Sequence, residues 1–346
     1  MPSLLHTYKR YRTLQTHRIT VLPVVILMPH SACNCRCVMC DIWKGNGNLQ
    51  QLTLDDIRGL IGSLKELDTR QVVLSGGEAL LNKNFFALCE LLKKEKFIVT
   101  LLSTGLTLKQ HAASLTTAVD EIIVSLDGPE GVHDAIRNIP GAFDKLATGV
   151  QAILDRAPGF RISGRSVIHR MNFRHWPGII DAAKDIGLRQ ISFLPADVST
   201  QAFNRPGYWN ENQQAQLLLN ADELREMRLV IEDVLNIYQR DFEEGFVAEH
   251  PEKIRKIYQY YAAFHGRNDF PYKRCNAPWV SVVIEPDGKV RPCFFHEPYG
   301  ELQEGPLKKI INSEAAIDFR RELDIAKNPV CVKCVCSLNL SPRSSL

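Results

Sequence analysis

The residues near the start of the chain that are best suited to chemistry are four cysteines within eight positions. They are Cys33, Cys35, Cys37 and Cys40, and three of them follow the spacing Cys33-x3-Cys37-x2-Cys40. Three thiolates on one tight loop can ligate three irons of a cubane cluster and leave the fourth iron free for a substrate. Such an open position separates catalytic metal sites from closed structural ones. The spacing also suits zinc, with Cys35 as a further ligand, so the motif alone favours iron–sulfur and leaves zinc open.

A second group of cysteines lies near the end of the chain, at Cys275, Cys293, Cys331, Cys334 and Cys336. We expect a β-hairpin that turns at Gly288 to bring the first two together, with the Cys-x2-Cys pair closing over them. Four thiolates would occupy every iron of a second 4Fe–4S cluster. Cys336 could replace Cys334 as the fourth ligand. A zinc ribbon with four thiolate ligands is the alternative for this group.

The elements that must position the first group alternate between strands and helices. Six apolar runs that stop at Gly, Pro or a polar turn predict strands over 21–28, 71–77, 97–105, 121–128, 160–168 and 189–196. Amphipathic stretches such as 52–67 and 82–95 lie between them and predict helices. This alternation indicates a parallel sheet with right-handed crossovers. A closed eight-fold barrel needs about 250 residues, so we expect an α/β fold with a partial (β/α)6 TIM-like barrel.

The pattern changes after the barrel, and we divide the chain accordingly. Residues 1–20 are an N-terminal extension, 21–200 the barrel, 201–270 a helical segment, and 271–340 a cysteine-rich domain of β-hairpin and helix. Within the helical segment, the sequence pattern predicts a long helix that is broken near Asn220, followed by a second helix. The hairpin is expected over 280–295, with a Pro-Asp-Gly turn, and the last residues are expected to fray.

Composition excludes several classes of protein. The net charge of +3 and the pI of about 8.3 are too weak a bias to indicate binding to nucleic acid or to an anionic membrane. No apolar run reaches the roughly 18 residues of a membrane span, and the basic start lacks the apolar core of a secretion signal. We therefore expect a cytoplasmic protein. Disulfides are rare in that compartment, so the clustered thiols indicate metal binding or catalysis.

The first cysteine motif, placed directly after the first strand, resembles the signature of the radical S-adenosylmethionine (SAM) superfamily. The resemblance implies that Cys33, Cys37 and Cys40 hold a catalytic 4Fe–4S cluster whose open iron chelates the methionine part of SAM. One electron then cleaves the sulfonium, and the resulting 5′-deoxyadenosyl radical removes hydrogen from the substrate. Such enzymes need an electron donor such as flavodoxin or ferredoxin. Many members carry an aromatic residue where this chain has Met39.

Further residues match this family at the ends of the second and third predicted strands. The segment SGGEALL carries Gly76, Gly77 and Glu78, which resemble a GGE motif that binds the methionine amino group. Consecutive glycines also allow backbone to approach a ligand closely. Ser103 and Thr104 in LLSTG resemble a segment that lies near the methionine carboxylate and the ribose. Either could instead cap a helix.

Later strand ends supply the remaining candidates for cofactor binding. The segment VSLDGPEGVHDAIR resembles the family branch that has C-terminal cysteine domains. It implies that Ser125 faces SAM and that Asp127 orients the ribose or the substrate. Arg165 is the candidate for the methionine carboxylate, and Asp197 is a candidate by position alone. Three residues of the same segment are expected to stabilise the following helix: His133, Asp134 and Arg137.

The second cysteine group resembles the auxiliary-cluster domain called SPASM, or its shorter form called twitch. A full SPASM domain carries two auxiliary clusters. Here ten cysteines, less three for the first cluster and four for the second, leave only Cys35, Cys89 and Cys336, which are scattered. We therefore expect a twitch-like domain with one auxiliary 4Fe–4S cluster that aids oxidation or positions the substrate. Its expected ligands are Cys275, Cys293, Cys331 and Cys334.

The substrate remains open between several classes. A small molecule in cofactor or natural-product biosynthesis is favoured over a ribosomally made peptide, because peptide-modifying relatives often carry an N-terminal recognition domain and the first strand here begins near residue 20. An RNA substrate gains little support from the weak net charge. A non-catalytic zinc-binding interaction protein is the alternative from another class, and it would bind zinc without affinity for SAM.

Overall fold

A computed structural model describes residues 4–344. In this part of the chain a single sheet runs in the order β6-β5-β4-β3-β2-β1-β7-β8-β9. The pairs from β6 to β7 are parallel, and β8 and β9 are antiparallel additions. The strands are β1 (Val24–Leu27), β2 (Gln71–Leu74), β3 (Ile98–Ser103), β4 (Glu121–Ser125), β5 (Arg161–Ile168), β6 (Gln190–Pro195), β7 (Ser281–Ile284), β8 (Lys289–Arg291) and β9 (Gly300–Glu301).

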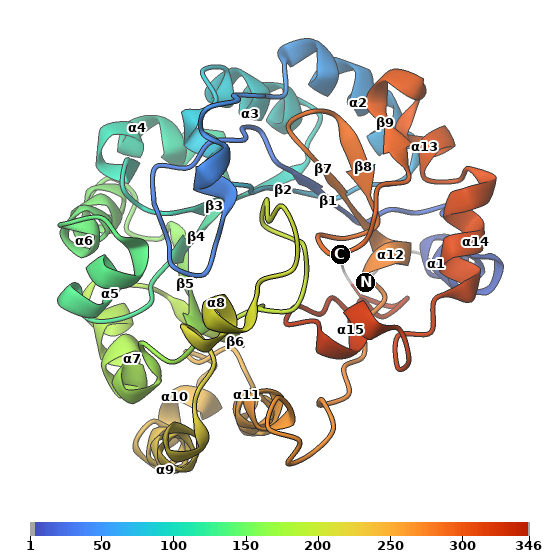
Figure 1. The fold of residues 1–346 in the computed structure, drawn as a ribbon. Coiled ribbons are helices and arrows are strands. Elements are labelled where there is room, and N and C mark those ends of the chain that lie inside the picture. The colour runs from blue at the N-terminus through green and yellow to red at the C-terminus, as the bar shows by residue number, and fades with distance from the viewer. Residues whose placement is uncertain (1–3, 345–346) are drawn as a thin grey trace.

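An outer layer of helices connects the first six strands, and Figure 1 shows it following the curve of the sheet. The helices are α2 (Leu54–Glu66), α3 (Phe85–Lys94), α4 (Leu108–Ala118), α5 (Glu130–Arg137), α6 (Ala142–Leu154) and α7 (Trp176–Asp185). Short 3₁₀ turns lie at η1 (Ile42–Gly45), η2 (Ala79–Leu81), η3 (Phe173–His175) and η4 (Leu302–Glu304). This arrangement confirms the predicted α/β fold with a partial barrel.

Strands and helices form here for the reasons the sequence indicates. The strands are apolar because the crossover helices bury the sheet, and Leu74, Val99 and Ile122 are each fully buried. Helix α2 begins at Thr53, whose side chain accepts a hydrogen bond from the amide of Asp56 in a capping box. The ends of the strands are thereby held rigidly beside one another.

The predicted hairpin forms, but it belongs to the barrel sheet rather than to a separate body. Strand β7 pairs in parallel with β1, with Val24 opposite Ser281. The turn between β7 and β8 uses Gly288 at φ 89°. Pairing with β7 covers the edge of β1 that would otherwise expose unpaired backbone groups. The cysteine-rich segment is consequently continuous with the strand that leads to the first cysteine motif.

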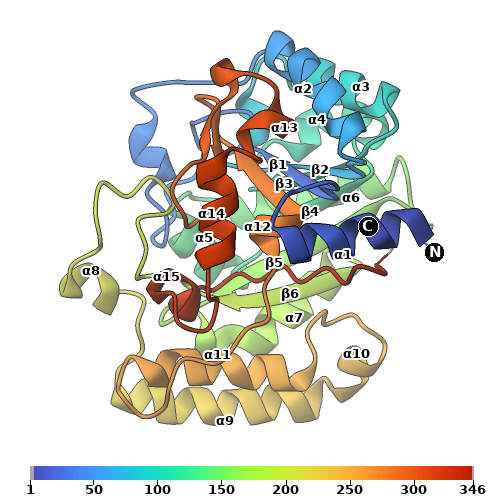
Figure 2. The ribbon, with the colours of Figure 1, turned by 90° about the vertical axis from the view of Figure 1, so that its right-hand side faces the viewer.

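The segment after β6 folds into four helices, of which α9, α10 and α11 pack outside the sheet while α8 lies apart from them, on the side of α15 (Figure 2). They are α8 (Glu211–Ala215), α9 (Ala221–Ile237), α10 (Gln239–Glu243) and α11 (Pro251–Ala263). The predicted break near Asn220 is confirmed, because the Asn220 side chain caps α9 by accepting from the amide of Glu223 at 2.9 Å. Helix α11 packs against both α9 and β6, so it forms the wall next to the last parallel strand.

The two ends of the chain lie side by side, as Figure 2 shows. The extension expected before the first strand contains α1 (Leu4–Thr16), and the C-terminal part contains α12 (Ala277–Val280), α13 (Leu307–Ile310), α14 (Glu314–Glu322) and α15 (Pro329–Lys333). The Arg10 guanidinium donates to the carbonyls of Ser341 at 3.2 Å and Ser344 at 3.1 Å. The described part of the tail is therefore held against α1, although fraying was expected.

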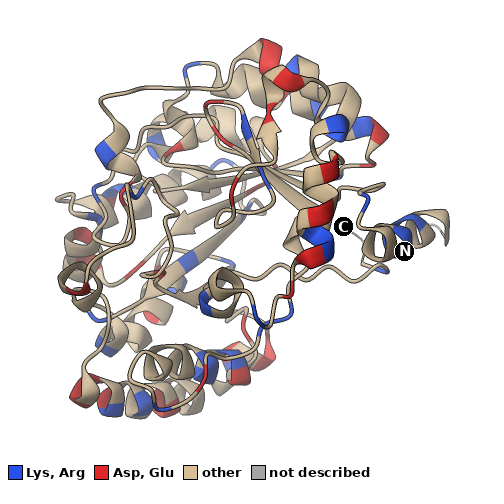
Figure 3. Cartoon of the chain, turned by 45° about the vertical axis from the view of Figure 1, so that its right-hand side comes forward, with Lys and Arg blue, Asp and Glu red and all other residues tan. Residues whose placement is uncertain are grey.

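The outer surface mixes both signs of charge, with Lys and Arg alternating with Asp and Glu along the outer helices (Figure 3). Of the helices in residues 4–344, not one combines the length and the apolar character that a membrane crossing requires.

Candidate active site

A cavity of about 700 Å³ opens at the carboxyl ends of the parallel strands. This is the end at which barrel enzymes place their chemistry. Nine of the residues expected to bind a cluster or SAM line it: Cys33, Cys37, Cys40, Gly76, Gly77, Ser103, Thr104, Ser125 and Arg165. Residues that are distant in the sequence thus meet here, from the loops after β1, β2 and β3 and from β3, β4 and β5 themselves.

The loop that carries the first three cysteines is fastened by backbone hydrogen bonds. The amides of Arg36 and Val38 donate to the carbonyls of Arg137 and Ile136, at 3.0 and 3.1 Å. Those carbonyls belong to the last turn of α5, where helix carbonyls lack partners within the helix. Cys33 is held separately, because Asn46 bonds to its amide at 3.0 Å and to its carbonyl at 2.9 Å. The loop therefore has a defined shape before any ligand binds.

Cys35 occupies a different environment from the three cysteines of the motif. It is 1% exposed, and the residues lining the cavity do not include it. Its thiol hydrogen-bonds with the sulfurs of Cys33 and Cys37, which raises the pKa of Cys35. The same contact with Cys35, aided by the charge of Arg137, lowers the pKa of Cys37 to about 6. Cys37 is thus favoured as a thiolate, the form that binds metals.

Arg137 lies next to the cysteine loop, and its partner is Asp127. Its Nη1 atom is 3.5 Å from the sulfur of Cys37, and its Nη2 forms an ion pair with Asp127 in which both side chains are buried. Asp127 also accepts from the amide of Val167 at 2.9 Å. His133 accepts from the Asp127 amide through Nδ1 at 3.1 Å, and burial lowers the pKa of His133 to about 4.

Asp127, which is expected to orient the ribose or the substrate, has its carboxylate turned toward protein partners. Its carboxylate points to Arg137 and Val167, and Asp127 does not line the cavity. The physical reason is that a buried carboxylate requires a cation and amide donors, and α5 and β5 supply them. Asp127 instead joins β5 to the cysteine loop through Arg137.

Glu78 is the second expected ligand-binding residue whose side chain turns away from the cavity. The carboxylate is fully buried and accepts from Ser103 Oγ at 3.0 Å, Thr104 N at 2.8 Å and Thr104 Oγ1 at 2.7 Å. Burial raises the pKa of Glu78, whereas the hydrogen bonds from these donors act to lower it. The side chain therefore fixes the end of β3, and through it Ser103 and Thr104, which do line the cavity.

The two glycines before Glu78 each occupy a position that disfavours a side chain, for a different structural reason. Gly76 adopts φ 113°, a conformation that side chains rarely tolerate. Gly77 lies so close to the cysteine loop that an added Cβ would stand 2.2 Å from the carbonyl oxygen of Ala32 and 3.0 Å from the Cβ of Cys33. The end of β2 therefore packs directly under the first cysteine of the motif.

Arg165 contributes one of the positive charges that line the cavity. It lies on β5, opposite Ser125 of β4 in the strand register, and both residues line the cavity. Its Nε atom donates a long hydrogen bond of 3.4 Å to Ser192 Oγ. Its guanidinium can therefore donate to an anionic group in the cavity.

The segment after β6 forms a network that sequence reasoning largely missed. Asp197, expected only from its position, pairs with Arg205 at 2.6 Å, with both side chains essentially unexposed. Arg205 also donates to the Met39 carbonyl at 3.4 Å and stacks 4.0 Å above the Trp209 ring. Trp209 in turn donates to Asp41 at 3.1 Å. This segment consequently fastens the loop around the third cysteine, and no strand-end motif marks Arg205.

The second cysteine group gathers at the same end of the sheet. Burial raises the pKa of Cys293 to about 11 and that of Cys331 to about 12. The charge of Cys275 also raises the pKa of both thiols. The sulfur of Cys334 donates to the Cys336 carbonyl at 2.8 Å, and Cys336 lines the main cavity. His296 Nε2 lies 3.2 Å from the sulfur of Cys331.

The donor sets fit thiolate-ligated clusters. Within residues 4–344, no three His, Cys, Asp or Glu side chains converge as they would around a single metal ion. Cys33, Cys37 and Cys40 come from one loop that is already fastened, and the second group consists of thiols, the ligands that hold iron–sulfur clusters. All ten cysteines are free of disulfides.

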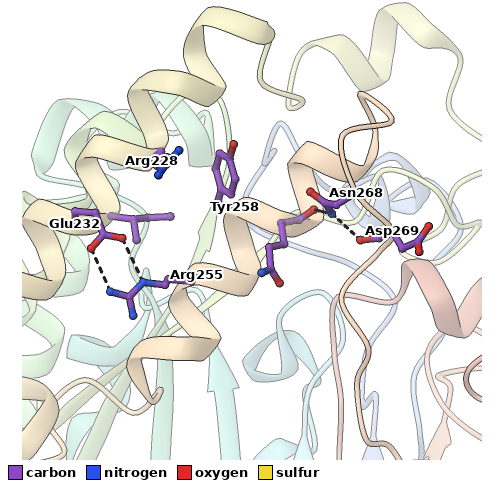
Figure 4. Close-up of a pocket in the computed structure, with 8 residues that line it drawn as sticks. Arg228, Glu232, Arg255, Tyr258, Asn268 and Asp269 are labelled. Atoms are coloured by element: carbon purple, nitrogen blue, oxygen red, sulfur yellow. Dashed lines mark hydrogen bonds and ion pairs between the residues drawn. The ribbon is translucent and has the colours of Figure 1, made fainter.

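A second hollow, of about 560 Å³, lies between α9 and α11 (Figure 4). An ion pair between Arg255 and Glu232 at 3.1 Å crosses it, and Arg228, Tyr258 and Asp269 complete much of its wall. The residues lining it include no cysteine and none of the expected site residues, so the chemistry belongs to the main cavity.

Comparison with known families gives one match around each cysteine group. Residues 27–189 match the family described as the radical SAM superfamily, and residues 275–335 match the SPASM iron–sulfur cluster-binding domain. The first match contains the first cysteine group, and the second contains Cys275, Cys293, Cys331 and Cys334 and ends one residue before Cys336.

Individual relatives are distant. The chain is 24% identical to the Fe-coproporphyrin III synthase of Methanosarcina barkeri, over 93% of this chain and 84% of the relative. It is 23% identical to the antilisterial bacteriocin subtilosin biosynthesis protein AlbA of Bacillus subtilis, over 80% of this chain and 58% of the relative. The fold is similar to that of Streptococcus suis SuiB bound to SAM, with a TM-score of 0.65 and 12% identity over 95% of this chain and 75% of SuiB.

Proposed function

The chain is a radical SAM enzyme with a C-terminal SPASM-type domain, and on this premise we propose that Cys33, Cys37 and Cys40 hold its catalytic 4Fe–4S cluster. The observation that carries the proposal is that these three thiols line the same cavity as the glycines after β2, whereas Cys35 lies outside it. Such a cluster supports one-electron cleavage of SAM to methionine and a 5′-deoxyadenosyl radical, which removes hydrogen from the substrate.

Around this cluster the chain supplies the contacts that orient SAM. We infer that the backbone at Gly76 and Gly77, which lines the cavity, meets the methionine amino group, because glycines let a ligand approach the backbone closely. Arg165 pairs with the methionine carboxylate, since its long bond to Ser192 leaves donors available. Ser103 and Thr104 lie within reach of the same ligand, and Glu78 holds them in place.

Ser125, opposite Arg165 in the register, completes the set of polar side chains that face SAM. Asp127 acts on the site indirectly, by fixing Arg137 beside Cys37. Indirect action explains why a residue of the strand-end motif is buried rather than exposed to the cavity.

We further propose a single auxiliary 4Fe–4S cluster, held by Cys275, Cys293, Cys331 and Cys334. The support is that Cys293, Cys331 and Cys334 are each acted on by the charge of another thiol of the group, Cys336 included. Cys336 is set apart because it lines the main cavity. A fully ligated cluster of this kind cannot bind the substrate directly. Its role is to accept an electron from the product radical or to position the substrate.

The substrate that we propose is a small biosynthetic molecule. A cavity of about 700 Å³ is within the range of small-molecule sites, and it must hold SAM as well. The relatives include both a coproporphyrin-linked synthase and a bacteriocin biosynthesis protein, so a ribosomally made peptide is the second candidate. Electrons would come from a cytoplasmic carrier such as flavodoxin or ferredoxin.

The cluster assignment is tested by anaerobic reconstitution followed by iron and sulfide counting. Two 4Fe–4S clusters predict about eight irons per chain. The Cys33→Ala/Cys37→Ala/Cys40→Ala variant should retain about four, and a Cys275→Ala/Cys293→Ala variant should retain the other four. Zinc in place of iron, or about four irons in the unaltered protein, would contradict the two-cluster proposal.

A further inference from the structure

The guanidinium of Arg137 stands beside a sulfur of the first cysteine motif, and this contact carries an inference about the redox properties of the site. Its Nη1 atom donates to the sulfur of Cys37 at 3.5 Å. The side chain is 8% exposed and lines the main cavity. Because arginine stays protonated in proteins, a permanent positive charge and an N–H donor face this sulfur.

The carboxylate of Asp127 fixes the direction in which this guanidinium points. Asp127 pairs with Nη2 of Arg137 and is itself fully buried. Its carboxylate accepts from the amide of Val167 at 2.9 Å, and its carbonyl accepts from Nδ2 of Asn172 at 2.9 Å. Its amide donates to Nδ1 of His133 at 3.1 Å. Asp127 is therefore held on every side, and Nη1 is kept turned toward the cysteine loop.

One donor of the same guanidinium remains unused. The Nε atom of Arg137 is buried, and among residues 4–344 it has no hydrogen-bond partner. A buried donor without an acceptor is costly, and neither Asp127 nor the sulfur of Cys37 takes this one. An anionic group bound in the cavity beside Cys37 would supply the acceptor that the chain lacks.

The Arg137 side chain is not what fastens the cysteine loop. The amides of Arg36 and Val38, on either side of Cys37, donate to the backbone carbonyls of Arg137 and Ile136 at 3.0 and 3.1 Å. A substitution at Arg137 removes the contact with sulfur and leaves these backbone bonds available. The effect of the charge can therefore be measured separately from the shape of the loop.

We propose that Arg137 acts through the sulfur of Cys37 to raise the reduction potential of the catalytic cluster, and that Asp127 moderates this effect. The inference rests on the cluster proposed above. Reduction transfers one electron from the external carrier to the cluster, so an adjacent cation and N–H donor stabilise the reduced form more than the oxidised form. Net charge and hydrogen bonds to sulfur are determinants of cluster potentials, and burial strengthens the effect.

The test uses the full chain carrying Cys275→Ala and Cys293→Ala, so that only the catalytic cluster is present. Potentiometric titration followed by electron paramagnetic resonance gives its midpoint potential. Arg137→Met should shift the midpoint to a more negative value. Asp127→Asn, which keeps Arg137 and removes its counter-charge, should shift it to a less negative one. The matched control is Arg36→Met, which removes the same charge from an exposed side chain of the cysteine loop and should cause little shift, because water screens that charge.

Opposite shifts in the two variants distinguish an electrostatic role from a structural one, because damage to the loop would not reverse its sign with the charge that is removed. An unchanged midpoint in Arg137→Met with iron retained, or shifts of the same sign in both variants, would overturn the role of Arg137. Absence of iron from the background without either change would contradict the catalytic cluster itself, and the inference with it.

A third variant covers loss of the cluster. If Arg137→Met or Asp127→Asn does not hold iron, the double variant Asp127→Asn/Arg137→Met is titrated in its place, since neither charge is then left alone. Its midpoint should also be more negative than that of the background, because the donor to sulfur is gone. An unchanged midpoint or loss of iron in the double variant would overturn the proposed role.

Discussion

Arg137 places its Nη1 atom 3.5 Å from the sulfur of Cys37, although one residue ends α5 and the other lies in the loop after β1. The same guanidinium pairs with buried Asp127. The contact connects the cysteine loop to the ends of β4 and β5, so one ion pair holds three parts of the site. The sequence indicated only that Arg137 stabilises its helix.

The ion pair makes a prediction about stability. Arg137→Met leaves the Asp127 carboxylate buried without a cation, which should lower the free energy of unfolding by about 3–5 kcal/mol. Urea denaturation of the cluster-free protein measures this. Asp127→Asn combined with Arg137→Met should cost less than the sum of the two single changes, because neither charge then remains alone. Simple additivity of the two changes would contradict the coupling.

Cys35 should be dispensable for the cluster. Cys35→Ala removes a buried thiol outside the cavity, so the reconstituted variant should keep about eight irons and lose on the order of 1 kcal/mol of stability. Cys37→Ala is the matched comparison from the same loop, and it should drop to about four irons. The reverse pattern would assign Cys35 as the ligand and refute the chosen triad.

Gly77 should tolerate no side chain. Gly77→Ala would force a Cβ to 2.2 Å from the Ala32 carbonyl, which must displace the backbone that leads to Cys33. We expect the variant to lose iron from the first site and to bind SAM weakly by calorimetry. The control is Gly62→Ala in α2, where an added Cβ meets no atom within 4 Å. It should keep its iron and gain up to about 1 kcal/mol of stability.

Glu78 should act through the loop after β3 rather than through SAM. Glu78→Gln replaces an acceptor of four hydrogen bonds by a group with two donors, which should cost about 1–3 kcal/mol of stability. Ser103→Ala removes one of those bonds and should cost less. If Glu78→Gln leaves stability unchanged and only weakens SAM binding, Glu78 contacts the ligand directly.

Periodic patterns predicted the fold well where they reflect burial. The six strands that the sequence predicts follow apolar runs because the outer helices bury one face of the sheet, where alternate residues of β2, β4 and β6 are buried. The break at Asn220 follows its capping preference. The addition of β7 to β1 was missed. Partner choice at a sheet edge depends on what else covers that edge, and the sequence of a four-residue apolar strand does not specify it.

The sequence predicted which backbone segments form the candidate site, but not where each side chain points. Motif spacing located the loops that line the cavity, but the direction of a side chain at a strand end depends on distant donors. Asp127 turns toward Arg137 and the amide of Val167, and Glu78 turns toward Thr104. Arg205 could not be found in this way, because its contact with Met39 joins residues 166 positions apart.

The most direct measurement mixes the anaerobically reconstituted protein with SAM and dithionite and quantifies 5′-deoxyadenosine by mass spectrometry. We expect its formation together with methionine, and none above background from the variant in which Cys33, Cys37 and Cys40 are replaced by alanine. If the protein carries about eight irons and yields no 5′-deoxyadenosine, or if the triple variant yields as much, these cysteines do not hold a cluster that cleaves SAM.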